Sequence, residues 1–391
     1  MSNGDRTGVK PKVMLIEACD FRGFPVGGQL TTAQQFVTVF GESLALVGVS
    51  IDDTPVGRWT RKAFNGVELD FFSFGRVDPD NKKPLIPRRL DAYWRLRFYK
   101  REILSLGVKA AYVVAPEVML AIQHWGLRIA YKFSGVENPL TMPRYAIGKW
   151  IAEPFERRLF SALAQHSELI TAAADQEAIQ ALKARSGGIL ADKTVISTPT
   201  LVDTGVFRVN RAAISGAAPL LVSCGRLNLV KGWNLILESF VLVKKEIPAA
   251  RLCFVGDGED RAKLEAAIAA ADLTDSVSIT GFLPPAEVAR MLNSADLFLL
   301  GSHREGWPTA LVEAEACGLP AVATHVSGVS SLIEEGTNGY IVRSRDPAEF
   351  ARAIVAALKL DVPNPKSLEI GAQHSLRRWR RNFGELWEPL R

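Results

Sequence analysis

The chain has 391 residues, of which 48% are hydrophobic and 23% charged, with 47 Lys and Arg against 42 Asp and Glu. This length predicts two or three domains with buried cores, and the composition excludes a disordered chain, a collagen-like repeat and a disulfide-stapled miniprotein. The four cysteines form no Cys-x-x-Cys pair, which predicts reduced core residues and a cytosolic setting.

Apolar runs of strand length alternate with longer stretches of helical periodicity. In the first half we expect strands at 13–18, 45–51, 69–74, 110–115, 128–133, 168–172 and 194–197. This alternation predicts βαβ units and a parallel sheet. The first run is too short for a signal peptide or a membrane span, and no other window approaches 18 uninterrupted apolar residues. We therefore expect no membrane-spanning helix.

A basic stretch interrupts this pattern between residues 82 and 109. Nine Lys and Arg face only Asp91 and Glu102 there, and four aromatic residues are interleaved, namely Tyr93, Trp94, Phe98 and Tyr99. A basic helix with aromatic residues can lie on an anionic membrane or bind phosphates. The alternative is a solvated helix whose aromatic side chains pack inward.

The alternation restarts in the second half, after residues 210–218, which lack periodicity and read as a linker. Strands are expected at 220–224, 251–255, 276–280, 297–300, 321–324 and 340–342. The sequence therefore predicts two doubly wound α/β domains of similar size, at 1–205 and 206–370, facing a central cleft. Residues 371–391 form a basic, aromatic segment, predicted to be a C-terminal helix that packs back on the first domain.

The segment 299–324, LLGSHREGWPTALVEAEACGLPAVAT, is the most informative. Pro308 suits the start of a helix and Gly318 its end, so a helix from about 308 to 317 is expected. Its free N–H groups near residues 309–311 form an anion site. Glu305 and Glu313 would lie on either side, where they repel phosphate but accept hydrogen bonds from sugar hydroxyls. A phosphate flanked by two polyhydroxyl rings is a nucleotide sugar.

Two further segments support this interpretation. In LLVSCGRLNLVKGWNLILESF, residues 220–240, Arg226 follows the strand and Lys231 lies at the entrance to the next helix. Two cations in one strand-to-helix loop suit a diphosphate leaving group. The segment 253–264, CFVGDGEDRAKL, is another glycine turn that opens a helix; it lacks the third glycine of a dinucleotide-binding motif, which argues against an oxidoreductase.

Together these motifs resemble the retaining nucleotide-sugar glycosyltransferases of the GT-B fold, family 4 in particular. The matching positions are Glu305, Gly306, Pro308, Leu311, Glu313, Ala314, Ala316, Gly318 and Pro320 in one motif, and Gly225, Arg226, Leu227, Lys231 and Gly232 in another. VGDG at 255–258, ADLF at 295–298 and NGYIV at 338–342 also match. The strong resemblance covers residues 195–360; the first half matches only in general pattern, including a glycine pair at 27–28.

The resemblance implies a role for each matching residue. Arg226 and Lys231 would neutralise the departing diphosphate, Glu305 would contact the donor sugar, and Glu313 would hold the ribose hydroxyls. Residues 280–284 would bracket the base through backbone groups. The donor-binding residues implied are Gly28, Gly225, Gly281, Gly306, Trp307, Pro308, Thr309, Ala310, Leu311 and Glu313.

The resemblance also implies a mechanism without a side-chain nucleophile, cofactor or metal. The acceptor would attack from the face that the leaving group departs, and the phosphate would take its proton, so that stabilising the leaving group is the main catalytic task. The Asp-Pro-Asp at 78–80 is read as a turn rather than a metal site. The chain departs from the family in lacking a His after the fifth strand, where Ser134 and Glu137 stand, and in carrying Glu315 at a position that is commonly Met.

We therefore predict a cytoplasmic, membrane-peripheral hexosyltransferase. It would move a sugar from a UDP- or GDP-linked donor to a saccharide or lipid-linked saccharide, in cell-surface polysaccharide or lipopolysaccharide biosynthesis. Residues 82–109 and 377–381 would contact an anionic membrane. The alternatives are a nucleotide-sugar epimerase or hydrolase of the same fold and an inactive nucleotide-sugar-binding relative. A nucleic-acid partner is not expected, because the net charge is only +5 and no recognition motif occurs.

Overall fold

The computed structural model describes residues 11–24, 28–64, 66–79, 81, 86–135, 148–198, 201–210, 218–376 and 378. The chain divides after Thr198 into two compact units, with residues 199–381 in the second. The division falls seven residues before the boundary predicted from the sequence, and residues 211–217 of the predicted linker lie outside the described part of the chain.

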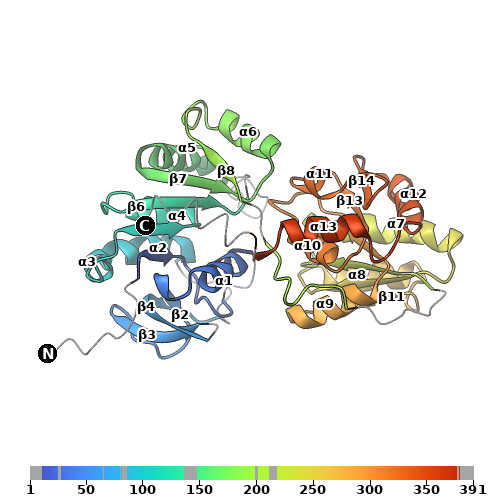
Figure 1. Ribbon diagram of the computed structural model, residues 1–391, viewed down its shortest axis with the longest axis horizontal. Helices are drawn as coiled ribbons and strands as arrows, with labels where there is room; N and C mark the ends of the chain where they lie inside the picture. The colour runs from blue at the N-terminus through green and yellow to red at the C-terminus, as the bar shows by residue number, and fades with distance from the viewer. Residues whose placement is uncertain are drawn as a thin grey trace. The chain divides into compact units, whose positions relative to one another are not determined.

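Unit 1 is built on an eight-stranded sheet in the order β3-β4-β2-β1-β5-β6-β7-β8 (Figure 1). Every neighbouring pair is parallel except β3 and β4. The strands are β1 Val13–Ile16, β2 Leu44–Ser50, β3 Trp59–Phe64, β4 Val67–Arg76, β5 Ala110–Val113, β6 Arg128–Phe133, β7 Ser167–Ala172 and β8 Val195–Ser197. The central strands are buried over their whole length, as expected for a sheet covered on both faces.

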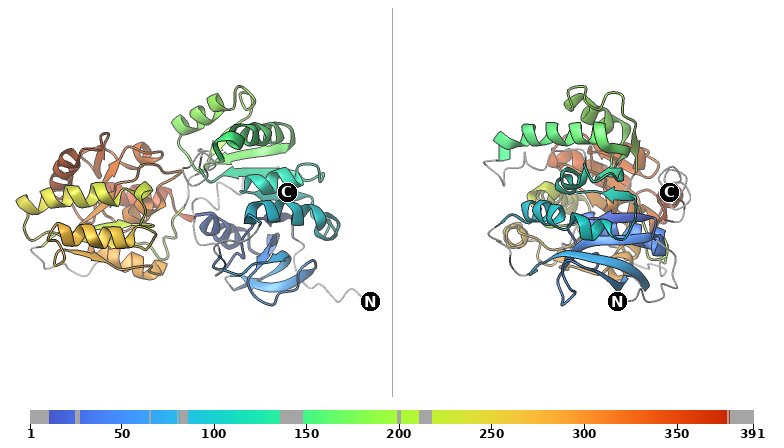
Figure 2. Two further views of the ribbon diagram at one scale, coloured as in Figure 1. Left: turned by 180° about the vertical axis from the view of Figure 1, so that it is seen from behind. Right: turned by 90° about the vertical axis from the view of Figure 1, so that its left-hand side faces the viewer.

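Helices cover both faces of this sheet, as Figure 2 shows from two further directions. They are α1 Gly28–Phe40, η1 Gly41–Ser43, α2 Arg88–Phe98, α3 Lys100–Leu104, α4 Pro116–Ile122, α5 Gly148–His166 and α6 Gln176–Arg185. One core joins β1, β2 and β5 to α2, α4, α5 and α6 through residues such as Ile16, Leu96 and Leu163. On the other face Phe36 of α1 packs against Tyr112, with ring centroids 4.0 Å apart.

Unit 2 is built on a six-stranded, fully parallel sheet in the order β11-β10-β9-β12-β13-β14. The strands are β9 Leu220–Cys224, β10 Arg251–Val255, β11 Val277–Ile279, β12 Leu297–Leu300, β13 Ala321–Thr324 and β14 Gly339–Val342. Numbered within the unit, the order is 3-2-1-4-5-6, which defines the Rossmann topology. The first and fourth strands, β9 and β12, are therefore neighbours at the point where the order reverses.

The helices of unit 2 are η3 Leu229–Lys231, α7 Trp233–Glu246, α8 Arg261–Ala270, α9 Pro285–Ser294, α10 Thr309–Ala316, α11 Val329–Leu332, α12 Pro347–Ala357 and α13 Pro365–Gln373. The core buries Phe240 of α7 and Ile354 of α12 against the strands. α13 packs against α10, where Gly371 leaves no room for a Cβ above the main chain of Ala316. These contacts hold α10 in place.

The predicted strands are all present, but one strand was missed. β3 pairs antiparallel with β4, and the sequence between them is Asn-Gly, with Gly66 in the left-handed region at φ +78°, which is a strong hairpin signal. The sequence of β3 contains no apolar run, because β3 is an edge strand with polar residues on its outer face.

The predicted C-terminal helix begins in unit 2. Residues 371–373 end α13, and Ser375 forms a bridge with Val202 of the same unit. Residues 377 and 379–391 lie outside the described residues, and of the basic residues at 377–381 expected to meet a membrane only Arg378, which is exposed, is described. No helix in the described part of the chain is long and apolar enough to cross a membrane.

Candidate active site

The predicted site residues of unit 2 gather at the reversal point of its sheet. Open α/β sheets bind ligands in the crevice beyond the carboxyl ends of the strands at this point. Residues 225–232 follow β9, and residues 301–308 follow β12 and lead into α10. The two loops that the sequence singled out are therefore neighbours in space.

Glycines let these two loops touch. Gly232 has φ +67°, and a Cβ on it would lie 1.8 Å from the carbonyl oxygen of Gly301. The N–H of His303 donates to the carbonyl of Val230 at 2.7 Å. Asn228 caps the short helix η3 by accepting the N–H of Lys231 at 3.1 Å. The chain is thus fixed on both sides of Lys231.

Lys231 and Glu305 form an ion pair across the two loops. Lys231 Nζ lies 2.7 Å from Glu305 Oε1 and 2.9 Å from Oε2. The Ser302 hydroxyl donates to Glu305 Oε1 at 2.6 Å. The Glu305 side chain is only 9% exposed, whereas that of Lys231 is 37% exposed. The Glu305 carboxylate is therefore buried and fixed by Ser302 and Lys231, whereas the Lys231 ammonium remains accessible to solvent.

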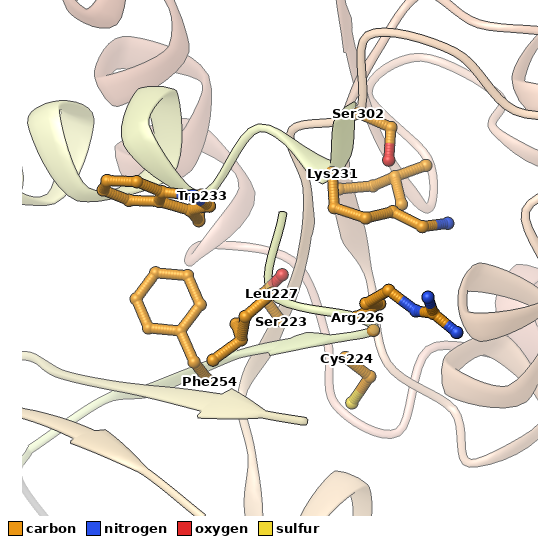
Figure 3. A pocket seen from close by; sticks show the side chains of 10 residues that line it. Ser223, Cys224, Arg226, Leu227, Lys231, Trp233, Phe254 and Ser302 are labelled. Atoms are coloured by element: carbon orange, nitrogen blue, oxygen red, sulfur yellow. The ribbon is translucent and has the colours of Figure 1, made fainter. Parts of the chain in front are cut away.

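Arg226 has a different environment. It is exposed, and within the described part of the chain its guanidinium has no hydrogen-bond or ion-pair partner. It lines one small pocket together with Cys224, Lys231 and Ser302, and Figure 3 shows the Arg226 and Lys231 side chains extending to the same side of it. A fork of free N–H donors beside a half-exposed ammonium suits an anion with several oxygens.

Glu313 lies on α10, half-buried, with no hydrogen-bond partner for its carboxylate among the described residues. Burial raises its pKa to about 7. Its charge acts on Cys224, whose thiol pKa is raised by burial first and by Glu313 next. Glu313 therefore lies near the end of β9. Its carboxylate, which has no partner among the described residues, is able to accept a hydrogen bond from a ligand hydroxyl.

The start of α10 offers fewer N–H donors than the sequence predicted. The N–H of Thr309 donates to the Trp307 carbonyl and that of Leu311 to the Pro308 carbonyl, both at 2.9 Å. The first turn thus closes on itself. Of the three N–H groups predicted at residues 309–311, only that of Ala310 has no acceptor among the described residues. The N–H of Gly306, just before the helix, has none there either.

Two other predicted donor residues have structural side chains. Trp307 is buried, packs against His374 with the rings tilted by 37° and their centroids 5.5 Å apart, and leaves no room for a Cβ on Gly328. Leu311 is fully buried in unit 2. Trp307 can reach a ligand only through its main chain, and Leu311 has neither its side chain nor its N–H available. Pro308 is buried at the N-cap, and Thr309 and Ala310 are half-buried.

Glycines also bring the loops after β9, β10 and β11 together. A Cβ on Gly256 would lie 1.9 Å from the Gly225 carbonyl oxygen, and the Gly225 N–H donates to Val255 at 3.0 Å. Gly256 forms a bridge with Gly281, which has φ +75°. The next residue, Phe282, is among the most exposed aromatics of the described chain. Gly281 thus continues the same sheet edge, with an exposed ring beside it.

Gly28 belongs to the other unit, where it is the first residue of α1. No group of three or more His, Cys, Asp or Glu side chains in the described residues could hold a metal ion.

Two residues of the site were missed in the sequence. Ser302 supports Glu305, as described above. Arg345 donates to the carbonyls of Gly301 at 2.9 Å and Ser302 at 3.1 Å, so it holds the loop that carries both. Ser302 lies three residues before Glu305 and could have been found by its position. Arg345 lies 44 residues from its partner, and no local pattern marks it.

Comparison with known sequences identifies this unit. Residues 209–374 match the sequence model of the glycosyl transferases group 1 family. The chain carries a glycosyl transferases group 1 domain. The group 1 domain contains every predicted site residue except Gly28.

Curated relatives support the same assignment over part of their length. The amylovoran biosynthesis glycosyltransferase AmsK of Erwinia amylovora is 37% identical over 144 residues, which are 35% of this chain and 34% of AmsK. The putative colanic acid biosynthesis glycosyltransferase WcaL of Escherichia coli is 36% identical over 152 residues, 37% of each chain. The chain thus spans about a third of the length of these relatives.

Solved structures resemble the chain over almost its full length. Sucrose-phosphate synthase from Thermosynechococcus elongatus has a TM-score of 0.75 at 16% identity, covering 97% of this chain and 99% of the other. Anabaena HepE in complex with UDP and glucose has a TM-score of 0.71 at 16% identity, covering 96% and 99%. The predicted fold class is confirmed: two Rossmann-like α/β domains of the GT-B type.

Proposed function

We propose that the protein is a glycosyltransferase that moves a sugar from a nucleoside-diphosphate sugar to a saccharide or lipid-linked saccharide. The observation that carries the proposal is Arg226, exposed and without a partner among the described residues, beside the Lys231–Glu305 ion pair at the reversal point of the group 1 domain. AmsK and WcaL are named for polysaccharide biosynthesis, which supports a role in polysaccharide assembly. We propose that this polysaccharide, or a lipopolysaccharide, is a cell-surface one made at the inner face of the cytoplasmic membrane.

The site suggests how the leaving group is stabilised. The Arg226 guanidinium donates two hydrogen bonds to the diphosphate. The Lys231 ammonium moves from Glu305 toward the phosphate and neutralises part of its charge. Glu305 is then released to accept hydrogen bonds from the sugar hydroxyls. Glu313 accepts hydrogen bonds from the ribose. These roles use both cations and both carboxylates discussed above and require no metal ion.

The reaction we propose retains the configuration at the anomeric carbon. The bond from this carbon to the phosphate oxygen breaks, and the bond to the acceptor oxygen forms on the same face. The acceptor proton passes to the departing phosphate. No side-chain nucleophile is required, since the cations of the group 1 domain stabilise the charge that develops on the diphosphate.

A binding screen tests the donor site first. The full chain is heated with UDP, GDP, ADP and their common sugar conjugates, beside the variants Arg226→Ala and Glu313→Ala. UDP is the first choice because HepE was solved with it. We expect a rise in melting temperature with one nucleotide only, lost in both variants. Arg251→Ala is the matched control. Arg251 is an exposed arginine of the same sheet, at the amino-terminal end of β10, whereas the site lies at the carboxyl ends of the strands.

The second measurement separates transfer from the alternatives. An epimerase or hydrolase would consume the donor at a rate that added acceptor does not change, and an inactive relative would bind without turnover. We expect turnover that depends on the acceptor and a rate that EDTA does not change. By NMR, the anomeric carbon of the product should have the same configuration as that of the donor. A product of inverted configuration would refute the retaining mechanism alone.

A further inference from the structure

A row of large apolar side chains is exposed along α2. Ile86 is 55% exposed, Leu90 49%, Trp94 60% and Phe98 77%. They recur every four residues, so those on the helix share one face. Four of the nine large apolar side chains that are exposed in the described residues belong to this row. We call these four residues the α2 stripe.

The α2 stripe is separate from the core of unit 1. The opposite face of the helix buries Ala92 and Leu96, and Tyr93 and Tyr99 pack against that core. The aromatic residues of the basic stretch therefore divide: two support the fold, and Trp94 and Phe98 face solvent. Neighbouring exposed apolar side chains with polar residues around them mark an interaction surface.

The arginines around α2 divide in the same way. Arg95 Nε donates to the carboxylate of Asp91 at 2.7 Å, and Arg89 lies 3.6 Å from Glu117. Arg88 donates to two backbone carbonyls. Arg97 and Arg101 are exposed and have no ion-pair partner among the described residues. These two charges lie on the same stretch of chain as the stripe.

We infer that the α2 stripe inserts into the interface of an anionic membrane, with Arg97 and Arg101 against the lipid phosphates. An apolar helical face flanked by arginines, with a tryptophan at its centre, is the pattern of a helix that lies in the membrane surface. Tryptophan is favoured at the headgroup level because its ring is apolar and its N–H is polar. The charge of the flanking residues selects anionic lipid over a neutral one.

This inference deepens the proposed function by naming the surface at which a lipid-linked acceptor would be met. It does not depend on which sugar is transferred. It can also fail while donor binding succeeds, because the α2 stripe lies in unit 1 and the donor residues Arg226 and Glu313 lie in the group 1 domain.

The test is sedimentation of the full chain with vesicles of phosphatidylcholine alone or with about a third of phosphatidylglycerol. We expect partitioning onto the anionic vesicles only, weakened by salt. Trp94→Ser/Phe98→Ser should lower the partition coefficient at least tenfold. Arg97→Gln/Arg101→Gln should lower it about twenty-five-fold at low salt, at roughly fivefold for each arginine. Val209→Ser and Arg251→Gln, exposed residues of unit 2, are the matched controls and should change nothing.

Two further readouts make the outcome decisive. Brominated lipids should quench the fluorescence of the wild type more than that of Trp94→Phe, since the ring enters the bilayer interface. All variants should keep their melting temperature and their shift with nucleotide. The inference is overturned if the wild type stays in solution with anionic vesicles at low salt, or if the stripe variants partition like the wild type. Dimerisation that Trp94→Ser/Phe98→Ser abolishes, without vesicle binding, would assign the face to a second copy instead.

Discussion

Lys231 Nζ and Glu305 Oε1 lie 2.7 Å apart, although 74 residues separate them in the chain. The resemblance to family 4 implied different tasks for these residues, one at the diphosphate and one at the sugar. In the free protein they neutralise each other. Since the ammonium is the more exposed of the two, an incoming phosphate can reach it without uncovering the carboxylate.

We expect Lys231→Met to lower the free energy of unfolding by about 1–2 kcal/mol, because it leaves the mostly buried Glu305 carboxylate with Ser302 as its side-chain partner. Chemical denaturation measures the change. Lys231→Met/Glu305→Gln should regain most of the stability but none of the donor turnover. A single variant as stable as the wild type would show that the pair contributes nothing to folding.

Arg226→Ala should weaken binding of the nucleoside diphosphate at least tenfold, since charge-assisted hydrogen bonds are worth about 1.5–3 kcal/mol. The melting temperature of the free variant should stay that of the wild type, because Arg226 is exposed. Calorimetric titration measures the affinity, with Arg251→Ala as the control. An unchanged affinity would place the diphosphate elsewhere.

Binding of a UDP-sugar should strengthen several-fold between pH 6 and pH 8. Burial raises the pKa of Glu313 to about 7, and the ionised carboxylate is the stronger acceptor for ribose hydroxyls. The diphosphate of a UDP-sugar carries no group that titrates in this range, so the change of affinity with pH comes from ionisation of the protein. Glu313→Gln should bind weakly with a flat profile. A wild-type profile that is flat as well would argue against contact between Glu313 and the ribose.

Gly232→Ala should destabilise the group 1 domain by more than about 2 kcal/mol. A Cβ at φ +67° is strained, and it would also collide with the Gly301 carbonyl. Gly336→Ala is the matched control: Gly336 has φ +76° but open space around it, so the substitution should cost only about 1 kcal/mol, from the left-handed backbone alone. A similar loss in both variants, measured by denaturation, would show that the contact between the two loops is not required.

The stability of the whole chain should fall as the pH rises from about 5 to about 8. Burial, and then the neighbouring Glu117, raise the pKa of Glu17 to about 8. Over this range Glu17 is therefore neutral in the folded chain and ionised in the unfolded chain. Because the unfolded chain binds fewer protons, the free energy of unfolding falls as the pH rises. Glu17→Gln should reduce the slope in denaturation at several pH values, and Glu68→Gln, at an exposed position of β4, should not. An unchanged slope in Glu17→Gln would mean that other groups cause it.

Much of the site could be read from the sequence because its signals are local. Strands such as 220–224 and 297–300 are apolar runs that end at a glycine, and α10 lies between Pro308 and Gly318 as predicted. Arg226, Lys231 and Glu305 lie in the loops after these strands and Glu313 lies on α10, so their places followed from their spacing to these markers.

What depends on contacts between distant residues could not be read in this way. The ion pair of Lys231 with Glu305, the support of the loop by Arg345, and the loss of the Thr309 and Leu311 donors arise only when the chain has folded. The same holds for α2, where the sequence shows arginines and aromatics but not which of them are used inside unit 1. By itself the sequence determined the order of strands and helices, the positions of the charges along them and the family resemblance, since periodicity, capping and turn residues act over a few positions. Only the tertiary structure decided which charges are paired and which remain available, because pairing requires side chains from distant segments to meet.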